Sequence, residues 1–197
     1  MLERLDEALA RGHGDFTATS AAVRPVGTTG SVRVTVKLAY RGHPWGTVPV
    51  EIAPAEGRVG EELERVPVRA LDAVGLSSPT DVACVSIRYQ MAQKLHACTQ
   101  VFEDGPANRR FRDLIDVLLL RELMPDDDLP RVRAACVEIF TLRATHPWPP
   151  ELTTVAEWRE PYAELARETA FPLTDVDSAA TAVGLLIDEI DGAHGST

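Results

Sequence analysis

Residues 87–123 read IRYQMAQKLHACTQVFEDGPANRRFRDLIDVLLLREL, and two helical segments within this stretch decide the fold. The first is predicted from apolar residues that recur at about 100° of rotation per residue and so share one face. These residues are Ile87, Met91, Leu95, Cys98, Val101 and Phe102. Lys94 lies inside this apolar face. Because an ammonium group loses hydration there, Lys94 must extend to a polar edge or meet a lasting negative partner.

The second segment, residues 108–123, carries candidate partners for Lys94. It is apolar around almost its whole circumference, a pattern typical of a helix that is buried on most sides. Asn108 is expected to be its N-cap. Asp113 and Asp116 are three residues apart and therefore share a face of the helix. Two carboxylates on a mostly buried helix require a cation, and Lys94 is the candidate.

A purely structural interpretation accounts for the same charges. In this interpretation Asp113 pairs with Arg109 four residues earlier, and both aspartates stabilise the N-terminus of their helix. Lys94 then only extends its stem along apolar surface to reach solvent. The residue pattern alone leaves this interpretation and a binding site both open.

The chain of 197 residues has an ordinary globular composition, with 45% hydrophobic and 25% charged residues. Its net charge of -10 argues against a protein that binds nucleic acid through its general electrostatic field. Arg109, Arg110 and Arg112 nevertheless form a local basic cluster next to Asp113. The composition therefore allows a local anion site but not an extended basic surface.

The cysteines and the apolar runs predict a cytoplasmic protein. Cys84, Cys98 and Cys136 are odd in number and lie in apolar surroundings, as reduced core cysteines do. Residues 1–14 carry acids and lack an apolar segment, so no signal peptide is predicted. The longest apolar run, residues 117–120, is too short to cross a bilayer, and no membrane partner is expected.

The remaining sequence completes a predicted α+β fold. A short helix is expected over residues 1–10, and strands over residues 15–26, 31–40, 47–54 and 66–71. The turn at residues 27–30 joins the first two strands into an antiparallel hairpin. Pro49 disfavours a fully paired central position for the third, because proline cannot donate to a ladder.

The second half of the chain is predicted to be helical. Helical spacing recurs over residues 129–145, 156–170 and 178–193. The stripe that Trp158, Tyr162 and Leu165 form is better explained as core than as a base-stacking platform. We therefore expect two domains: a partial sheet region over residues 1–78, and a helical domain over residues 79–197.

Two segments of the sequence resemble the central signature of the AbiEii/AbiGii toxin family of nucleotidyltransferases. AQKLHA, residues 92–97, is similar to the family's Glu-Lys-Leu-x-Ala helix. RFRDLIDVLLL, residues 110–120, is similar to its Arg-x-(Lys/Arg)-Asp-(aromatic or apolar)-x-Asp-Leu helix. Gln93 stands where the family usually has glutamate, and Val117 stands where it usually has leucine.

The resemblance implies a partial nucleotidyltransferase sheet followed by a helical lobe. It also implies a toxin of a toxin–antitoxin or phage-defence system that transfers a nucleoside monophosphate from a nucleoside triphosphate to RNA or another acceptor. Mg²⁺ would be the cofactor and a cognate antitoxin the protein partner. The alternative is a non-catalytic module, derived from the same fold, that binds a nucleotide or a partner protein.

The family motif also implies roles for individual residues. Lys94 would contact the nucleotide phosphates, and Arg109 and Arg112 are further candidates for binding the nucleotide. Asp113 and Asp116 would orient the lysine or act as catalytic carboxylates. The motif leaves open which of the two aspartates fills the family position.

A strand early in the family fold carries a metal-binding carboxylate. Glu51 is the only acid in the strand predicted over residues 47–54, so it is the candidate for this role. The alternative is a solvated glutamate on the outer face of the sheet.

One part of the family pattern is missing from this sequence. The family has a Gly-Ser turn followed by paired aspartates, whereas Gly30 and Ser31 precede a strand without Asp-x-Asp. Glu51 alone does not supply the ligands for two metal ions. Three explanations remain open: the gene start is truncated, another chain supplies the first lobe, or the protein no longer catalyses transfer.

Overall fold

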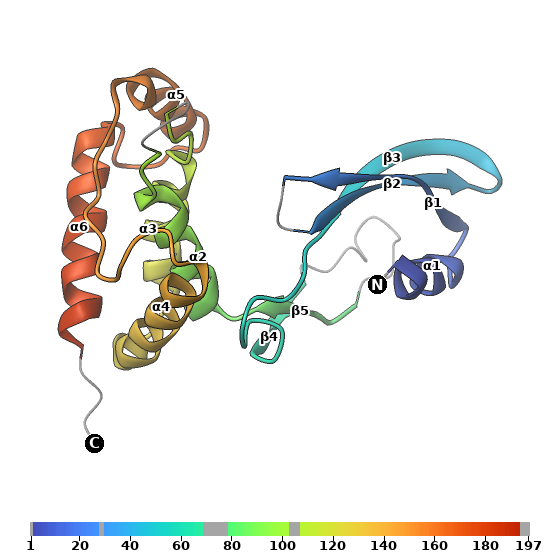
Figure 1. Ribbon diagram of the computed structural model, residues 1–197. Helices are drawn as coiled ribbons and strands as arrows, with labels where there is room; N and C mark the ends of the chain where they lie inside the picture. Colours follow the sequence, from blue (N-terminus) through green and yellow to red (C-terminus); the bar gives the residue numbers. More distant parts are fainter. Residues whose placement is uncertain (1, 28–29, 69–78, 103–106, 194–197) are drawn as a thin grey trace. The chain divides into compact units, whose positions relative to one another are not determined.

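The computed structural model describes residues 2–27, 30–68, 79–102 and 107–193. The chain divides into two compact units, Met1–Ala55 and Glu56–Thr197, which are described separately (Figure 1). Helices together with two small antiparallel sheets confirm the predicted α+β class. The expected domain boundary after residue 78 adjoins residues 69–78, which lie outside the described residues, so this boundary stays a prediction.

The first unit consists of helix α1 (Leu2–Ala10) and a three-stranded antiparallel sheet. Strand β2 (Ser31–Tyr40) lies between β1 (Phe16–Val26) and β3 (His43–Ile52). The predicted hairpin of β1 and β2 is therefore confirmed. Pro49 lies in β3, at the edge of this sheet, where a missing amide hydrogen does not interrupt a ladder on both sides.

The register of the sheet separates an apolar face from a polar one. Val34 in β2 lies opposite Val23 in β1 and Val50 in β3, and its side chain is buried. Because successive side chains of a strand point to opposite faces, the neighbouring Arg33 lies on the other face. There its Nε atom donates a hydrogen bond of 2.8 Å to Glu51 Oε1.

The second unit begins with a two-stranded antiparallel sheet and continues with helices. Its strands are β4 (Leu63–Pro67) and β5 (Asp81–Val85). Its α-helices are α2 (Ile87–Thr99), α3 (Arg112–Leu123), α4 (Leu129–Arg143), α5 (Arg159–Glu168) and α6 (Val176–Gly192), with short 3₁₀ turns at Asp126–Asp128 and Ala156–Trp158. The strand predicted over residues 66–71 corresponds in part to β4, and its residues 69–71 lie outside the described residues.

The core of the second unit lies between its helices. Helix α2 packs against α3 and α4, and α6 packs against the same two helices. Each contributes fully buried apolar side chains, among them Leu95 from α2, Leu114 from α3, Ile139 from α4 and Val183 from α6. Trp158 and Tyr162 are also buried, which confirms that they belong to the core.

Two expected helix boundaries are wrong. Helix α2 ends at Thr99, so Val101 and Phe102 are not part of its apolar face, and they are 72% and 50% exposed. Helix α3 begins at Arg112, so Asn108 is not its N-cap. Val101, Phe102 and Asn108 therefore belong to the connection between α2 and α3, although the sequence pattern assigns them to the two helices.

Helix α3 is also buried on fewer sides than its sequence predicts. Leu119 is 43% exposed and Leu123 is 69% exposed. The pattern of leucines records hydrophobicity, but it does not say which sides of the helix have neighbours.

The cysteines fit the expected core role in part. Cys98 and Cys136 are buried and free, whereas Cys84 is free and half-buried. Burial raises the pKa of Cys98 to about 12, so its thiol stays protonated at neutral pH. Among the described residues, none of the helices has the length and apolar character needed to cross a membrane.

Candidate functional site

The structure brings together the lysine and the two aspartates that the sequence singled out. Lys94 extends from α2, and Asp113 and Asp116 extend from the first turns of α3. The Lys94 Nζ atom lies 2.6 Å from Asp116 Oδ2 and 3.5 Å from Asp113 Oδ1. One ammonium group is therefore shared between two carboxylates, so Lys94 does not simply extend into solvent.

The two carboxylates differ strongly in exposure. The side chain of Asp113 is 6% exposed, whereas that of Asp116 is 45% exposed. The Asp113 carboxylate also accepts a hydrogen bond of 2.5 Å from Arg110 Nε. Asp113 is thus enclosed between two cations, and Asp116 is the carboxylate that incoming molecules can reach. The expected pairing of Asp113 with Arg109 is wrong, because the segment before Arg112 is not helical.

Asn108 links the end of α2 to the start of α3. Its Nδ2 group donates hydrogen bonds to the backbone carbonyl oxygens of Ala97, at 2.9 Å, and Gln100, at 2.8 Å. Its Oδ1 atom accepts one of 2.9 Å from the Arg110 backbone N–H. The Asn108 carbonyl in turn accepts a hydrogen bond from Trp158 Nε1. The buried Asn108 side chain therefore fixes the connection between the helix that carries Lys94 and the helix that carries the aspartates.

Two arginines give the site a net positive charge. The charges of Lys94 and Arg110 balance those of Asp113 and Asp116, as the ion pairs above show. Arg109 and Arg112 are exposed at the start of α3. Neither of these two arginines has an ion-pair partner among the residues that the structure describes.

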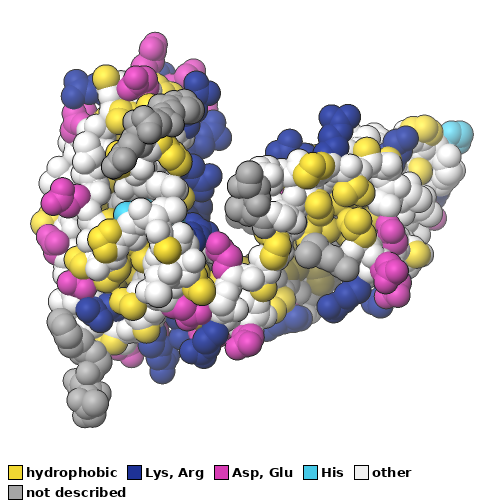
Figure 2. All heavy atoms as spheres, in the orientation of Figure 1, with side chains coloured by type: hydrophobic (Ala, Val, Ile, Leu, Met, Phe, Trp, Pro, Cys, Tyr) yellow, Lys and Arg dark blue, Asp and Glu magenta, His cyan; other side chains and the backbone are white. Residues whose placement is uncertain are grey.

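This positive charge favours an anionic ligand. Figure 2 shows Lys and Arg side chains gathered along one edge of the helical unit. The start of a helix adds to the attraction, since its backbone N–H groups carry partial positive charge. The local charge therefore suits phosphate groups even though the whole chain is acidic.

Glu51 lies in the first unit, on the polar face of its sheet. Its side chain is 53% exposed, and its Oε1 atom pairs with Arg33. The carboxylates of Asp113 and Asp116 are likewise engaged by cations. Among the described residues, no group of three or more His, Cys, Asp or Glu side chains could hold a metal ion. By themselves, then, the described residues do not fit a complete Mg²⁺ site.

Gln93, which stands where the family usually has glutamate, has a specific partner. Its Nε2 group donates a hydrogen bond of 2.8 Å to Glu56 Oε2. Glu56 also accepts two hydrogen bonds from Arg143, at 2.9 and 2.7 Å. The Arg143 guanidinium, helped by Gln93, holds the pKa of Glu56 below its usual value. A glutamate at position 93 would face this carboxylate with like charge, so the amide suits this position.

A second polar network surrounds His96, two residues beyond Lys94 on α2. The His96 ring is buried, and its Nδ1 atom lies 3.2 Å from Arg143 Nη1. Because a guanidinium can only donate, Nδ1 must accept, and the Nε2–H group donates to Thr145 Oγ1 at 2.9 Å. Burial is the main cause that lowers the pKa of His96 to about 4, so the ring is neutral. Sequence reasoning did not single out His96, which stands at the variable position of the AQKLHA segment, or Glu56, which belongs to no recognisable motif.

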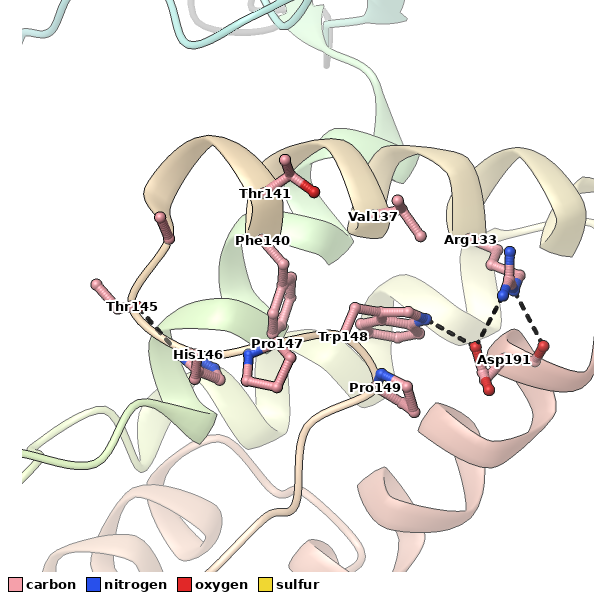
Figure 3. A pocket seen from close by; sticks show the side chains of 11 residues that line it. Arg133, Val137, Phe140, Thr141, Thr145, His146, Pro147, Trp148, Pro149 and Asp191 are labelled. Carbon is pink, nitrogen blue, oxygen red and sulfur yellow. Dashed lines mark hydrogen bonds and ion pairs between the residues drawn. The ribbon is translucent and has the colours of Figure 1, made fainter.

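A pocket of about 610 Å³ lies beside the C-terminal half of α4 (Figure 3). At one end, Arg133 and Trp148 both contact Asp191: the Trp148 Nε1–H group donates a hydrogen bond of 2.9 Å to its carboxylate, and Arg133 Nη2 lies 3.2 Å from it. At the other end, Thr145 contacts His146. Asp191 is thus paired with two residues of the pocket lining, and its ion pair with Arg133 joins α4 to α6. We assign this pocket a structural role.

A comparison with known families places the chain among nucleotidyl transferases. Residues 1–183 match the family model described as nucleotidyl transferase AbiEii toxin, type IV toxin–antitoxin system. The chain therefore belongs to the AbiEii nucleotidyl transferase toxin family, and the resemblance inferred from its two signature helices is confirmed. A nucleotidyltransferase-like role in a toxin–antitoxin system follows from this membership. No curated protein matches the chain significantly.

Proposed function

We propose that this protein binds a nucleoside triphosphate at Lys94, Asp113 and Asp116 and transfers its nucleoside monophosphate to RNA or another acceptor. The observation that carries the proposal is one lysine held between a buried and an exposed carboxylate. Arg109 and Arg112, which are exposed and have no ion-pair partner among the described residues, shortly precede these carboxylates in the chain. Such a cluster neutralises phosphates and leaves one carboxylate accessible to the acceptor.

The two aspartates take different roles in this proposal. Asp113 is enclosed and contacts both Lys94 and Arg110, so it orients the lysine. Asp116 is accessible, and a phosphate that arrives at Lys94 competes with it for the ammonium group. The released carboxylate then accepts the proton of the acceptor hydroxyl as that oxygen bonds to the α-phosphorus and pyrophosphate leaves. In this proposal Asp113 positions the lysine, and Asp116 accepts the proton.

Arg109 and Arg112 bind the outer phosphates in this proposal. Both lie at the start of α3 and are exposed. A guanidinium presents paired donors that match phosphate oxygens, and it stays charged at any physiological pH. Their contribution is therefore to affinity and to stabilising the pyrophosphate that leaves.

Mg²⁺ remains the predicted cofactor, since nucleotidyl transferases generally use a divalent metal. Glu51 remains the predicted protein ligand, although its carboxylate is paired with Arg33. When bound, the metal would neutralise phosphate charge. Phosphate binding by Lys94 and the arginines does not depend on it.

The proposal is tested by nucleotide binding and by transfer. We expect nucleoside triphosphates to raise the unfolding temperature of the protein, because a ligand that binds only the folded state stabilises it. Lys94→Met should abolish this increase in unfolding temperature. Lys37→Met should preserve it, because Lys37, the other lysine of the chain, is exposed on the sheet of the first unit. Label from a nucleotide labelled at the α-phosphate should appear in RNA with the wild-type protein. Binding that survives Lys94→Met in a folded variant would contradict the proposed site.

A second candidate function is nucleotide binding without catalysis. The described residues do not assemble a metal-binding group, and the sequence lacks the Asp-x-Asp of the family. This alternative predicts stabilisation by the nucleotide with Mg²⁺ but no label in any acceptor, with or without the cognate antitoxin. A purely structural charge cluster predicts no stabilisation at all.

A further inference from the structure

A groove of about 420 Å³ runs along the face of α3 that carries Asp116. Arg112, Asp116, Leu119 and Glu122 line it from α3. These positions recur at helical spacing, so they form one continuous row along the helix. The end of α5 and the residues that follow it, 169–172, form the other wall.

We propose that this groove binds the nucleoside part of the triphosphate whose phosphates contact Lys94 and Arg112. This inference rests on the proposed function and extends it to the base and sugar. Asp116 belongs to both sites, because its Oδ2 atom contacts Lys94 while its side chain lines the groove. Phosphates bound at Lys94 therefore place the attached nucleoside at the mouth of the groove.

The order of residues along α3 fits the order of groups in a nucleotide. Arg112 and Glu122 are separated by about 15 Å along the helix axis, at about 1.5 Å of rise per residue. A cation stands at the phosphate end of this row, and Asp116 follows where the phosphates meet the nucleoside. Leu119 follows as apolar surface for the base, and Glu122 then provides hydrogen-bond acceptors for its polar edge.

The wall opposite α3 is held in place by its own backbone hydrogen bonds. Ala170 adopts a left-handed conformation with φ of 52°, and the Phe171 backbone N–H donates a hydrogen bond of 2.8 Å to Ala166 O. This turn ends α5 and packs Phe171 into the core, where it is 8% exposed. A fixed apolar wall binds a flat base with little loss of conformational entropy.

The experiment compares two ligands by calorimetry: inorganic tripolyphosphate, which has no nucleoside, and the four ribonucleoside triphosphates. We expect at least one nucleoside triphosphate to bind the wild-type protein more tightly than tripolyphosphate. Leu119→Gln removes exposed apolar surface without adding charge, and it should weaken nucleoside triphosphate binding about fivefold while tripolyphosphate binding stays unchanged. Leu123→Gln is the matched control, because Leu123 is exposed on the same helix but does not line the groove.

The outcomes separate this inference from the proposed function. Equal affinity for tripolyphosphate and for every nucleoside triphosphate would overturn the groove but leave the Lys94 site standing. The same holds if Leu119→Gln and Leu123→Gln have equal effects on nucleoside triphosphate binding. If the wild-type protein binds neither kind of ligand, both the groove and the proposed function are wrong.

Discussion

Replacing Asn108 by alanine should destabilise the protein more than any ordinary surface substitution. The side chain donates to the carbonyl oxygens of Ala97 and Gln100 and accepts from the Arg110 N–H group. Each such hydrogen bond contributes about 1 kcal/mol net, so the loss of all three should lower the free energy of unfolding by about 3 kcal/mol. The loss is large because the residue is buried, and water does not readily replace its carboxamide.

Urea unfolding followed by circular dichroism measures this free energy. Gln90→Ala is the matched control, because Gln90 makes one hydrogen bond of 2.6 Å to Val85 O and should lose only about 1 kcal/mol. Asn108→Asp keeps the acceptor for Arg110 but turns a carboxylate toward two carbonyl oxygens, so it should be no more stable than the alanine variant. A change below about 0.5 kcal/mol for Asn108→Ala would refute the assigned role, since ordinary surface substitutions stay within that range.

The remaining predictions concern the charged groups. Asp113→Asn should lower the free energy of unfolding by about 1–3 kcal/mol in urea unfolding, because a buried carboxylate that contacts both Lys94 and Arg110 loses its charge. Asp116→Asn should change this free energy by under about 1 kcal/mol, because Asp116 is exposed, and it should abolish label transfer. Equal stability of these two variants would contradict the difference in their burial. His96 binds its proton only near pH 4 when folded but near 6.5 when unfolded, so stability should fall as pH decreases between these values, by about 2 kcal/mol from pH 7 to pH 5. His96→Gln should flatten that slope, and an unchanged slope would contradict the depressed pKa. Gln93→Glu should place a second carboxylate against Glu56 and lower the unfolding temperature at pH 7, with a smaller effect at pH 4.

Local sequence patterns were sufficient to predict the sheet and the meeting of charges. The alternation of valine with polar residues in β2 predicts both the strand and its buried face, because side chains of a strand alternate. The spacing of Asp113 and Asp116 predicts one helix face, and the apolar surroundings of Lys94 predict a partner for its charge. The patterns themselves are local, although Lys94 and Asp116 are 22 residues apart and meet only because α2 packs against α3.

Features that depend on distant neighbours could not be predicted in this way. Asparagine is a common N-cap residue, but the Asn108 carboxamide instead donates hydrogen bonds to backbone carbonyl oxygens at the end of the preceding helix. Glu56 gains its partner Arg143 from a helix 87 residues further along the chain. Leu119 looks like core in sequence, yet the helices around α3 leave it half exposed. Which side of a helix remains open is decided by tertiary packing.

The central claim is that Lys94 binds phosphate beside Asp113 and Asp116, and lysine-selective NMR tests it most directly. The chain has two lysines, Lys37 and Lys94, so a protein labelled with ¹³C at lysine Cε gives two side-chain signals, and Lys37→Arg assigns them. Titration with a nucleoside triphosphate should shift the Lys94 signal until it saturates, while the Lys37 signal stays in place. A Lys94 signal that stays in place throughout the titration would contradict the claim.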